Sequence, residues 1–235
     1  MKPARHQSAR PRSLAIGMRA VGALALALTL ASCSLFGGGG EGGSNAAKSG
    51  GPGQADQSIV DAAPAELRSF YSQQIDWKPC EEGNFQCAKV KVPLDYAKPD
   101  GDRIELAVIK LATNGNKKGT LLVNPGGPGA SGFDFVRDAA NTNISDKVRS
   151  AYDIVGFDPR GVKRSAPVTC LTDKERDAYR AKTYAYETDA GLDAALADNK
   201  AIAAKCVEKT GPVLAHIDTF SAVKDLDILR GVVND

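Results

Sequence analysis

Two stretches near the middle of the chain alternate between hydrophobic and polar residues. Ala88, Val90 and Val92 are separated by lysines, and hydrophobic residues recur at every second position in residues 104–108. A period of two is typical of strands with one buried face. Residues 98–102 lie between the two stretches and have the sequence Lys-Pro-Asp-Gly-Asp, which favours a turn. The pattern therefore predicts an antiparallel hairpin.

The pattern changes further along the chain. Residues 120–123 and 152–157 are short apolar runs without alternation, as expected for parallel strands that are covered on both faces. Helical material separates the two runs, which gives a strand-helix-strand unit. A hairpin that leads into such a unit predicts an α/β domain with a mixed sheet.

Helical spacing appears in three places. Residues 64–73 predict a short amphipathic helix that begins at a proline. Residues 171–211 contain no strand pattern and predict two inserted helices. The first starts with a capping box formed by Thr172 and Glu175. Five residues of this insertion share one helical face: Leu192, Leu196, Ala203, Cys206 and Val207.

The end of the chain predicts a last helix. Thr219 is suited to cap it, because a threonine oxygen accepts hydrogen bonds from the first free amides. Four residues at helical spacing are expected to face the core: Val223, Leu226, Leu229 and Val233.

Composition supports one folded domain and excludes several classes of protein. Of the 235 residues, 43% are hydrophobic and 25% are charged, which excludes collagen-like and disordered chains. The formal net charge is +2, but the first acidic residue follows five basic ones, so the remainder is slightly acidic. Nucleic-acid binding is therefore not expected, because it depends on clustered positive charge.

Residues 1–33 have the features of an export signal. A basic stretch precedes an apolar run from Ala20 to Ala31, which is shorter than the roughly 20 residues that span a bilayer. Leu30-Ala31-Ser32-Cys33 resembles the lipobox of bacterial lipoproteins, in which the cysteine becomes the lipidated N-terminus. We favour this interpretation, with Cys33 as a lipid anchor on the outer face of the cell membrane. An ordinary cleaved signal peptide and a secreted protein are the alternative.

Residues 34–58 are rich in Gly and Ser and predict a flexible tether. The folded domain would then comprise residues 59–235.

Four cysteines remain beyond Cys33, and an even number in an exported chain suggests disulfides. Three pairings are possible, and we favour Cys80 with Cys87 and Cys170 with Cys206. A metal site is a weaker interpretation, because six residues separate Cys80 from Cys87 and zinc ligands are usually closer in sequence.

A glycine-rich bend follows the first apolar run, in residues 124–132. Glycine leaves backbone N–H groups exposed and proline makes the bend rigid, so the amides could stabilise an oxyanion during acyl transfer. A tight loop that packs a helix on a sheet would have the same composition. The bend also matches G-x-G-x-x-G, but Pro128 removes one amide, so a dinucleotide site is disfavoured. A phosphate loop would require Gly-Lys-Ser/Thr, which is absent here.

Several motifs in the same order resemble the exported tripeptidyl-aminopeptidase branch of the α/β-hydrolases, which are relatives of the prolyl iminopeptidases. The strongest are Asn-Pro-Gly-Gly-Pro-Gly-Ala-Ser-Gly at residues 124–132 and Tyr-Asp-Ile-Val-Gly-Phe-Asp-Pro-Arg-Gly at residues 152–161. Residues 77–87, 92–96 and 225–230 also agree with this branch. The resemblance covers residues 75–233 approximately.

The resemblance implies the N-terminal part of an α/β-hydrolase fold, with a mixed and mostly parallel sheet. It also implies a serine peptidase that acts on the N-termini of peptides, with no cofactor and no metal. The amide of Gly127 would be an oxyanion donor, with Gly126 and Gly129 shaping the bend. Asp158 and Arg160 would brace the next turn or form a structural ion pair. Lys163 departs from the usual glycine of this branch.

A serine hydrolase of this fold requires a G-x-S-x-G elbow, followed by an acid and then a histidine. The sequence contains no such elbow. His216 lies before any point where an elbow could occur, so the expected order excludes it as the histidine of a triad. We therefore expect an inactive front portion of a longer hydrolase, through a truncated or frame-shifted gene or a partial sequence. The alternatives are a non-catalytic surface lipoprotein that keeps half of the fold as a binding module, and an unrelated α/β domain.

Overall fold

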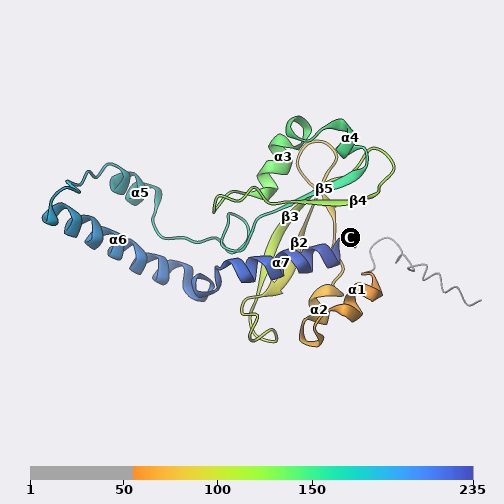
Figure 1. Ribbon diagram of the computed structural model, residues 1–235, viewed down its shortest axis with the longest axis horizontal. Coiled ribbons are helices and arrows are strands. Elements are labelled where there is room, and N and C mark those ends of the chain that lie inside the picture. The colour runs from red at the N-terminus through yellow and green to blue at the C-terminus, as the bar shows by residue number, and fades with distance from the viewer. Residues whose placement is uncertain (1–54, 235) are drawn as a thin grey trace, which may run out of the picture. The chain divides into compact units, whose positions relative to one another are not determined.

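The computed structural model describes residues 55–234, so the proposed signal peptide, Cys33 and most of the proposed tether lie outside the described residues. Helices and strands follow one another in a hairpin, a strand-helix-strand unit and a helical insertion (Figure 1). The elements, in chain order, are α1 (Gln57–Ala62), the 3₁₀-helix η1 (Ala65–Leu67), α2 (Arg68–Tyr71), β1 (Lys78–Pro79), β2 (Phe85–Pro93), β3 (Arg103–Leu111), β4 (Gly119–Val123), α3 (Gly132–Asn143), α4 (Asp146–Arg149), β5 (Tyr152–Phe157), α5 (Asp173–Arg180), α6 (Asp189–Thr210), the 3₁₀-helix η2 (Gly211–His216) and α7 (Thr219–Val232).

The described strands form one five-stranded sheet in the order β1-β2-β3-β5-β4. The predicted hairpin is confirmed, because β2 and β3 pair antiparallel along their whole length. The mixed sheet is also confirmed, since β4 and β5 are parallel whereas β3 and β5 are antiparallel. The expectation of a mostly parallel sheet is wrong for the described residues, in which β4 and β5 form the one parallel pair.

Burial differs between the two parallel strands. Every residue of β5 after Tyr152 is buried, as the apolar run predicts, but β4 is only partly covered. Leu121 of β4 is 40% exposed. The prediction of two covered faces is therefore right for β5 and wrong for β4, because β4 lies at an edge of the described sheet.

Alternation along the hairpin supplies two apolar clusters. Val90, Leu106 and Val108 belong to the larger cluster, which also contains residues of α2 and α7. Ala107 and Ile109 of β3 belong to the second cluster, with Val136 and other residues of α3. Helices of the described chain thus supply apolar cover for residues of both alternating sets, which is the arrangement of an α/β fold.

The last helix covers the larger cluster with a face that partly matches the predicted one, since Leu229 is buried and Leu226 packs against the cluster. Ile228, Leu229 and Val232 are buried, whereas Val223 is exposed. The N-cap is Asp218 rather than Thr219, because the Asp218 carboxylate accepts a hydrogen bond from the Ser221 amide. The predicted face shifts because a charged residue, Asp225, is buried within this helix.

The insertion consists of α5 and α6, as predicted, and the capping box of Thr172 and Glu175 is present. Both favoured disulfides are confirmed, Cys80–Cys87 and Cys170–Cys206. The expected apolar face of α6 is not covered, since Leu196 is 57% exposed and Val207 is 63% exposed. Helical spacing alone predicts such a face but does not show which element covers it.

Two short helices at the start of the described chain complete the larger cluster. Helix α1 begins at Gln57, inside the proposed tether, and contributes Val60. The predicted helix in residues 64–73 is present as η1 and α2. None of the helices in residues 55–234 combines the length and the apolar content that crossing a membrane requires.

Candidate active-site loop

The glycine-rich bend leaves the carboxyl end of β4 and ends at the N-terminus of α3. Gly126, Gly127 and Gly129 have φ angles of 79°, 121° and 97°, a region that side chains strongly disfavour. The bend is fixed by two hydrogen bonds, from the Gly126 amide to Asn124 and from the Ala130 amide to the Gly126 carbonyl. Within residues 55–234 the amides of Gly127 and Gly129 have no hydrogen-bond acceptor. Both glycines are exposed, so these two donors are open to a ligand.

The bend lies beside the segment that follows β5. Because β4 and β5 are parallel, their carboxyl ends meet at the same edge of the sheet, where α/β folds bind ligands. Ser131 joins the two segments. Its hydroxyl accepts the amide of Asp134 as the N-cap of α3 and donates to the carboxylate of Asp158.

Asp158 is completely buried, with 0% of its surface exposed. Its second oxygen accepts hydrogen bonds from the backbone amide and the guanidinium of Arg164, at 3.2 and 3.1 Å. Arg164 also contacts the ring of Phe133, 4.2 Å from the centroid, and pairs with Asp134 at 2.9 Å. A buried carboxylate with these partners is satisfied, and it fixes the bend to the turn after β5.

Positively charged side chains surround the carboxylate of Asp134 beside this turn. Its carboxylate accepts from Lys163 and Arg164 and lies near Arg137. Burial acts to raise the pKa of Asp134, but the hydrogen bonds from Lys163 and Arg164 outweigh it and hold the pKa below its ordinary value. Lys163, the residue that departs from the resemblance, thus takes part in an ion pair.

Arg160 points away from Asp158 and forms a separate buried ion pair. Its guanidinium binds both oxygens of Asp225, at 2.7 and 2.8 Å. The remaining donors bind the carbonyls of Pro93, Leu94 and His216 at 2.9 to 3.0 Å. Burial opposes the charge, but the pair with Asp225 raises the pKa of Arg160 above its ordinary value.

An ion pair between Asp158 and Arg160 does not form, because each has another partner. Asp158 binds Ser131 and Arg164, and Arg160 binds Asp225. Arg160 joins the end of β2, the middle of α7 and the end of η2. It is a structural tie beside the bend, whereas Asp158 contacts the residue that ends the bend.

The sequence did not identify Ser131, Arg164 and Asp225 as partners in these contacts. The sequence could have indicated Asp225, since this charged residue lies among the apolar positions that α7 buries. A second signal was the pair Gly132 and Gly156, because a Cβ atom on Gly156 would lie 2.1 Å from the carbonyl oxygen of Gly132. Only glycines permit this approach, which seats the first turn of α3 against β5.

A cleft of about 390 Å³ lies at the other end of the parallel strands, near Thr120 and Asp153. It contains Trp77, the single tryptophan of the chain, and the Lys110 ammonium lies 4.4 Å from the centroid of its ring. Burial lowers the pKa of Lys110. The cleft does not include the bend. In residues 55–234 no three His, Cys, Asp or Glu side chains gather so that they could hold a metal ion.

Comparison with known proteins relates the chain to hydrolases. No family model matches the chain. Individual relatives are 37–40% identical to it over about 68% of its length, and they are named as serine proteases, esterases and aminopeptidases. The resemblance to the tripeptidyl-aminopeptidase branch is therefore confirmed, and the chain is homologous to these hydrolases.

Three relatives represent the range of names. Serine protease Hip1 of Mycobacterium tuberculosis is 38% identical over 173 residues, which are 69% of this chain and 33% of the relative. Carboxylesterase B of the same species is 40% identical, over 67% of this chain and 32% of the relative. Tripeptidyl aminopeptidase of Streptomyces lividans is 37% identical, over 68% of this chain and 32% of the relative. The chain thus spans about one third of the length of these relatives.

Proposed function

We propose that the chain carries the oxyanion-binding portion of an exported serine hydrolase of the α/β-hydrolase fold. The whole enzyme would be an aminopeptidase that releases tripeptides or single residues from the N-termini of peptides. The observation that carries the proposal is the bend after β4, which presents the free amides of Gly127 and Gly129 at the carboxyl edge of two parallel strands. Such donors stabilise negative oxygen when an attacked carbonyl becomes tetrahedral.

The surroundings of the bend support this role. Ser131 and Asp158 hold its far end on the β5 side, and Gly132 is packed against Phe157. An oxyanion site requires such preorganisation, because donors that must first reorient stabilise the transition state less. The nucleophile, the acid and the histidine of a triad would come from residues beyond those of this chain, since its sequence has no G-x-S-x-G.

We also propose that Cys33 is lipidated and anchors the protein on the outer face of the bacterial membrane. The lipobox sequence and the glycine-rich segment after it support this location. Incorporation of a clickable fatty acid tests it directly. Label should be taken up by the natural chain and lost in Cys33→Ala, and label that persists in the variant would exclude lipidation at this residue.

The hydrolase proposal is tested first on this chain and on its coding region. The purified 235-residue chain should not hydrolyse aminoacyl or tripeptidyl chromogenic substrates, and turnover blocked by a serine-directed phosphonate would show that a nucleophile has been overlooked. The coding region after codon 235 should contain a G-x-S-x-G elbow, in this or another reading frame. A non-coding region without this motif would favour a non-catalytic binding module instead.

A further test uses the longer protein that such a reading frame would encode. Reaction with a phosphonate followed by structure determination should place a phosphoryl oxygen within hydrogen-bond distance of the Gly127 amide. Amides of Gly127 and Gly129 that point away from that oxygen would contradict the role proposed for the bend.

A further inference from the structure

The insertion is held together by polar contacts and one covalent bond. We call residues 171–211, which include α5 and α6, the helical arm. From its tip toward its base, Lys182 pairs with Asp198, Tyr179 donates to Asn199, and Glu175 pairs with Lys205 and Lys209. All of these side chains except Tyr179 and Asn199 carry charge, and the contacts lie at the surface.

The arm has almost no apolar interior. No residue of α5 is buried, and Ala195 is the one buried residue of α6. Surface ion pairs contribute little to stability because water and salt screen them. A pair of helices held by such contacts alone would be marginal, so a covalent bond between them has a large effect on their order.

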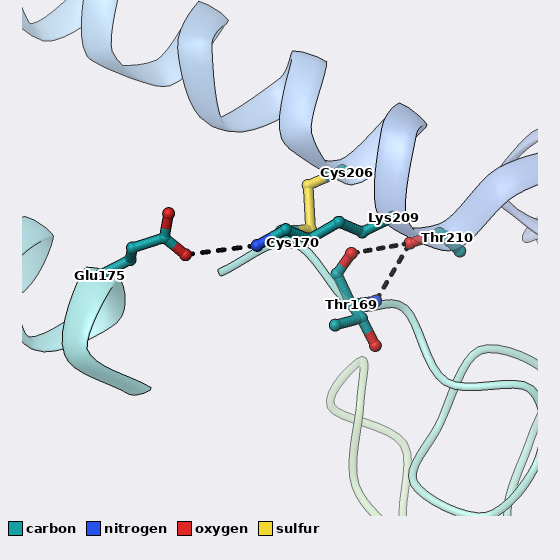
Figure 2. The surroundings of a disulfide bond; sticks show 6 residues. All are labelled: Thr169, Cys170, Glu175, Cys206, Lys209 and Thr210. Atoms are coloured by element: carbon teal, nitrogen blue, oxygen red, sulfur yellow. Dashed lines mark hydrogen bonds and ion pairs between the residues drawn. A yellow bond between two sulfur atoms is a disulfide. The ribbon is translucent and has the colours of Figure 1, made fainter. Parts of the chain in front are cut away.

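The disulfide lies at the base of the arm, where the chain enters and leaves it (Figure 2). Next to it, the Thr169 amide donates to the Thr210 hydroxyl at 3.0 Å, and that hydroxyl donates to the Thr169 carbonyl at 3.1 Å. Cys170 and Cys206 are both partly exposed, and neighbouring residues such as Val207 are open to solvent. Part of the surface of each cysteine is therefore open to solvent in the folded protein.

Two lysines lie next to Cys206 in α6, Lys205 immediately before it and Lys209 one turn later. Figure 2 shows the Lys209 side chain beside Cys170 on its way to Glu175. Both ammonium groups pair with Glu175, so these three side chains together carry one net positive charge beside the disulfide. A net positive charge favours a thiolate, and a better thiolate is a better leaving group in disulfide exchange.

We propose that Cys170–Cys206 is a redox-controlled clasp that fixes the helical arm in the oxidised protein and releases it in the reduced protein. A dithiol reductant supplies both electrons. One thiolate of the reductant attacks a sulfur of the disulfide, forms a mixed disulfide and displaces the other cysteine as a thiolate, which takes up a proton. The second reductant thiol then attacks the mixed disulfide and releases the remaining cysteine. The reductant ends as a disulfide and the arm as two thiols.

The contacts that hold the sheet region together do not involve the Cys170–Cys206 disulfide. Arg160 binds the carbonyl of His216, at the end of η2 beyond the arm, and the carbonyl of Leu94, directly after β2, and it also binds Asp225 of α7. These contacts lie on the sheet side of the clasp and contain no sulfur. Reduction should therefore release α5 and α6 while the sheet and α7 remain folded.

The test uses the 235-residue chain with Cys33→Ser, so that no free thiol competes for the disulfides. The oxidised protein is treated with dithiothreitol in native buffer, the cysteines are alkylated, and amide hydrogen exchange is followed by mass spectrometry. We expect Cys170 and Cys206 to be alkylated without denaturant, and exchange in α5 and α6 to become at least about tenfold faster. Exchange in β3, β5 and α7 should stay the same. In a parallel sample that is reduced but not alkylated, removal of the reductant and reoxidation should restore the protection of the arm.

A matched pair of variants separates the clasp from general disulfide loss. Cys170→Ser with Cys206→Ser should show fast exchange in the arm without any reductant. Cys80→Ser with Cys87→Ser should keep the arm protected until reductant is added. The proposal is overturned if Cys170–Cys206 resists reduction in the folded protein, if the reduced arm keeps its protection, or if the sheet loses protection together with the arm.

Discussion

The sheet region and the helical arm of this chain are stabilised by different physical means. In the sheet region, fully buried residues such as Ile109, Ile154 and Leu229 form the apolar clusters, and the buried charges of Asp158, Arg160 and Asp225 all have partners. In the arm, charged residues pair at the surface and a disulfide closes the base. One chain can therefore contain a region that is ordered by the burial of apolar side chains and a region that is ordered by a covalent cross-link. Four changes test this difference.

The buried ion pair should give the largest effect. Asp225→Ala leaves the Arg160 guanidinium buried without its carboxylate, which should cost about 3–5 kcal/mol of the free energy of unfolding. Urea unfolding followed by circular dichroism measures this loss. The double variant Arg160→Met with Asp225→Leu removes both charges and should recover part of the stability. If the single variant lost less than the double variant, Arg160 would not depend on Asp225.

Two leucines compare apolar burial in the two regions. Leu229 is completely buried in α7, so Leu229→Ala should cost about 2–5 kcal/mol. Leu196 is largely exposed in α6, and Leu196→Ala should change the free energy of unfolding by no more than about 0.5 kcal/mol. Thermal or urea unfolding of both variants measures the ratio. Equal losses would mean that the arm has an apolar partner in solution and would break the comparison.

Helix caps give a smaller contrast. Ser131→Ala removes both the cap of α3 and the donor to buried Asp158, which should cost about 1–3 kcal/mol of global stability. Thr172→Ala removes the capping box of α5, where the expected cost of about 1 kcal/mol falls on the arm alone. Hydrogen exchange should therefore rise across the sheet region in the first variant and only in α5 and α6 in the second. Ser131→Thr is the matched control, since threonine keeps the hydroxyl.

Acid should produce the smallest effect, and it should act on the arm. Hydrogen bonds from Lys205, Thr172 and Lys209 hold the pKa of Glu175 well below its usual range. A carboxyl whose pKa is lower in the folded state stabilises that state above its unfolded pKa of about 4.3 and ceases to do so as the pH falls through its folded pKa. Carboxyl NMR titration should show Glu175 charged when unfolded glutamates are already protonated, and Glu175→Gln should remove this contribution. A Glu175 titration near the unfolded value would contradict the ion pairs.

Much of the fold followed from local patterns, because its elements are short and each pattern is decided by near neighbours. Residues 88–92 and 104–108 identified the hairpin, and Thr172 with Glu175 identified the start of α5. The errors concern relations between distant segments. Val223 has the same spacing as buried leucines, but only the tertiary structure shows that α7 turns Asp225 inward to meet Arg160. Leu192 and Val207 share a helical face that no described element covers.

The candidate loop could be located from the sequence, but its supports could not. Glycines and prolines in residues 124–132 indicate a bend wherever they occur, so the position of Gly127 was clear. The contact of Ser131 with Asp158 joins residues that are 27 positions apart, and it depends on the parallel pairing of β4 with β5. The apolar runs predicted parallel strands at these positions, but they did not give the register that brings Ser131 to Asp158. Arg160 was expected beside Asp158, but residues 158–160 lie in the turn after β5, where the alternation of an extended strand does not apply.

The position of the single tryptophan provides an optical probe of one region. Trp77 packs against the larger apolar cluster under the Lys110 ammonium, whereas Tyr179, Tyr184 and Tyr186 lie in the arm. Fluorescence excited selectively at the indole therefore reports on the strands and gives no information about the insertion. Phenol emission is not selective in the same way, because Tyr71, Tyr96 and Tyr152 lie outside the arm, so a change that leaves the indole signal constant identifies an event in the arm.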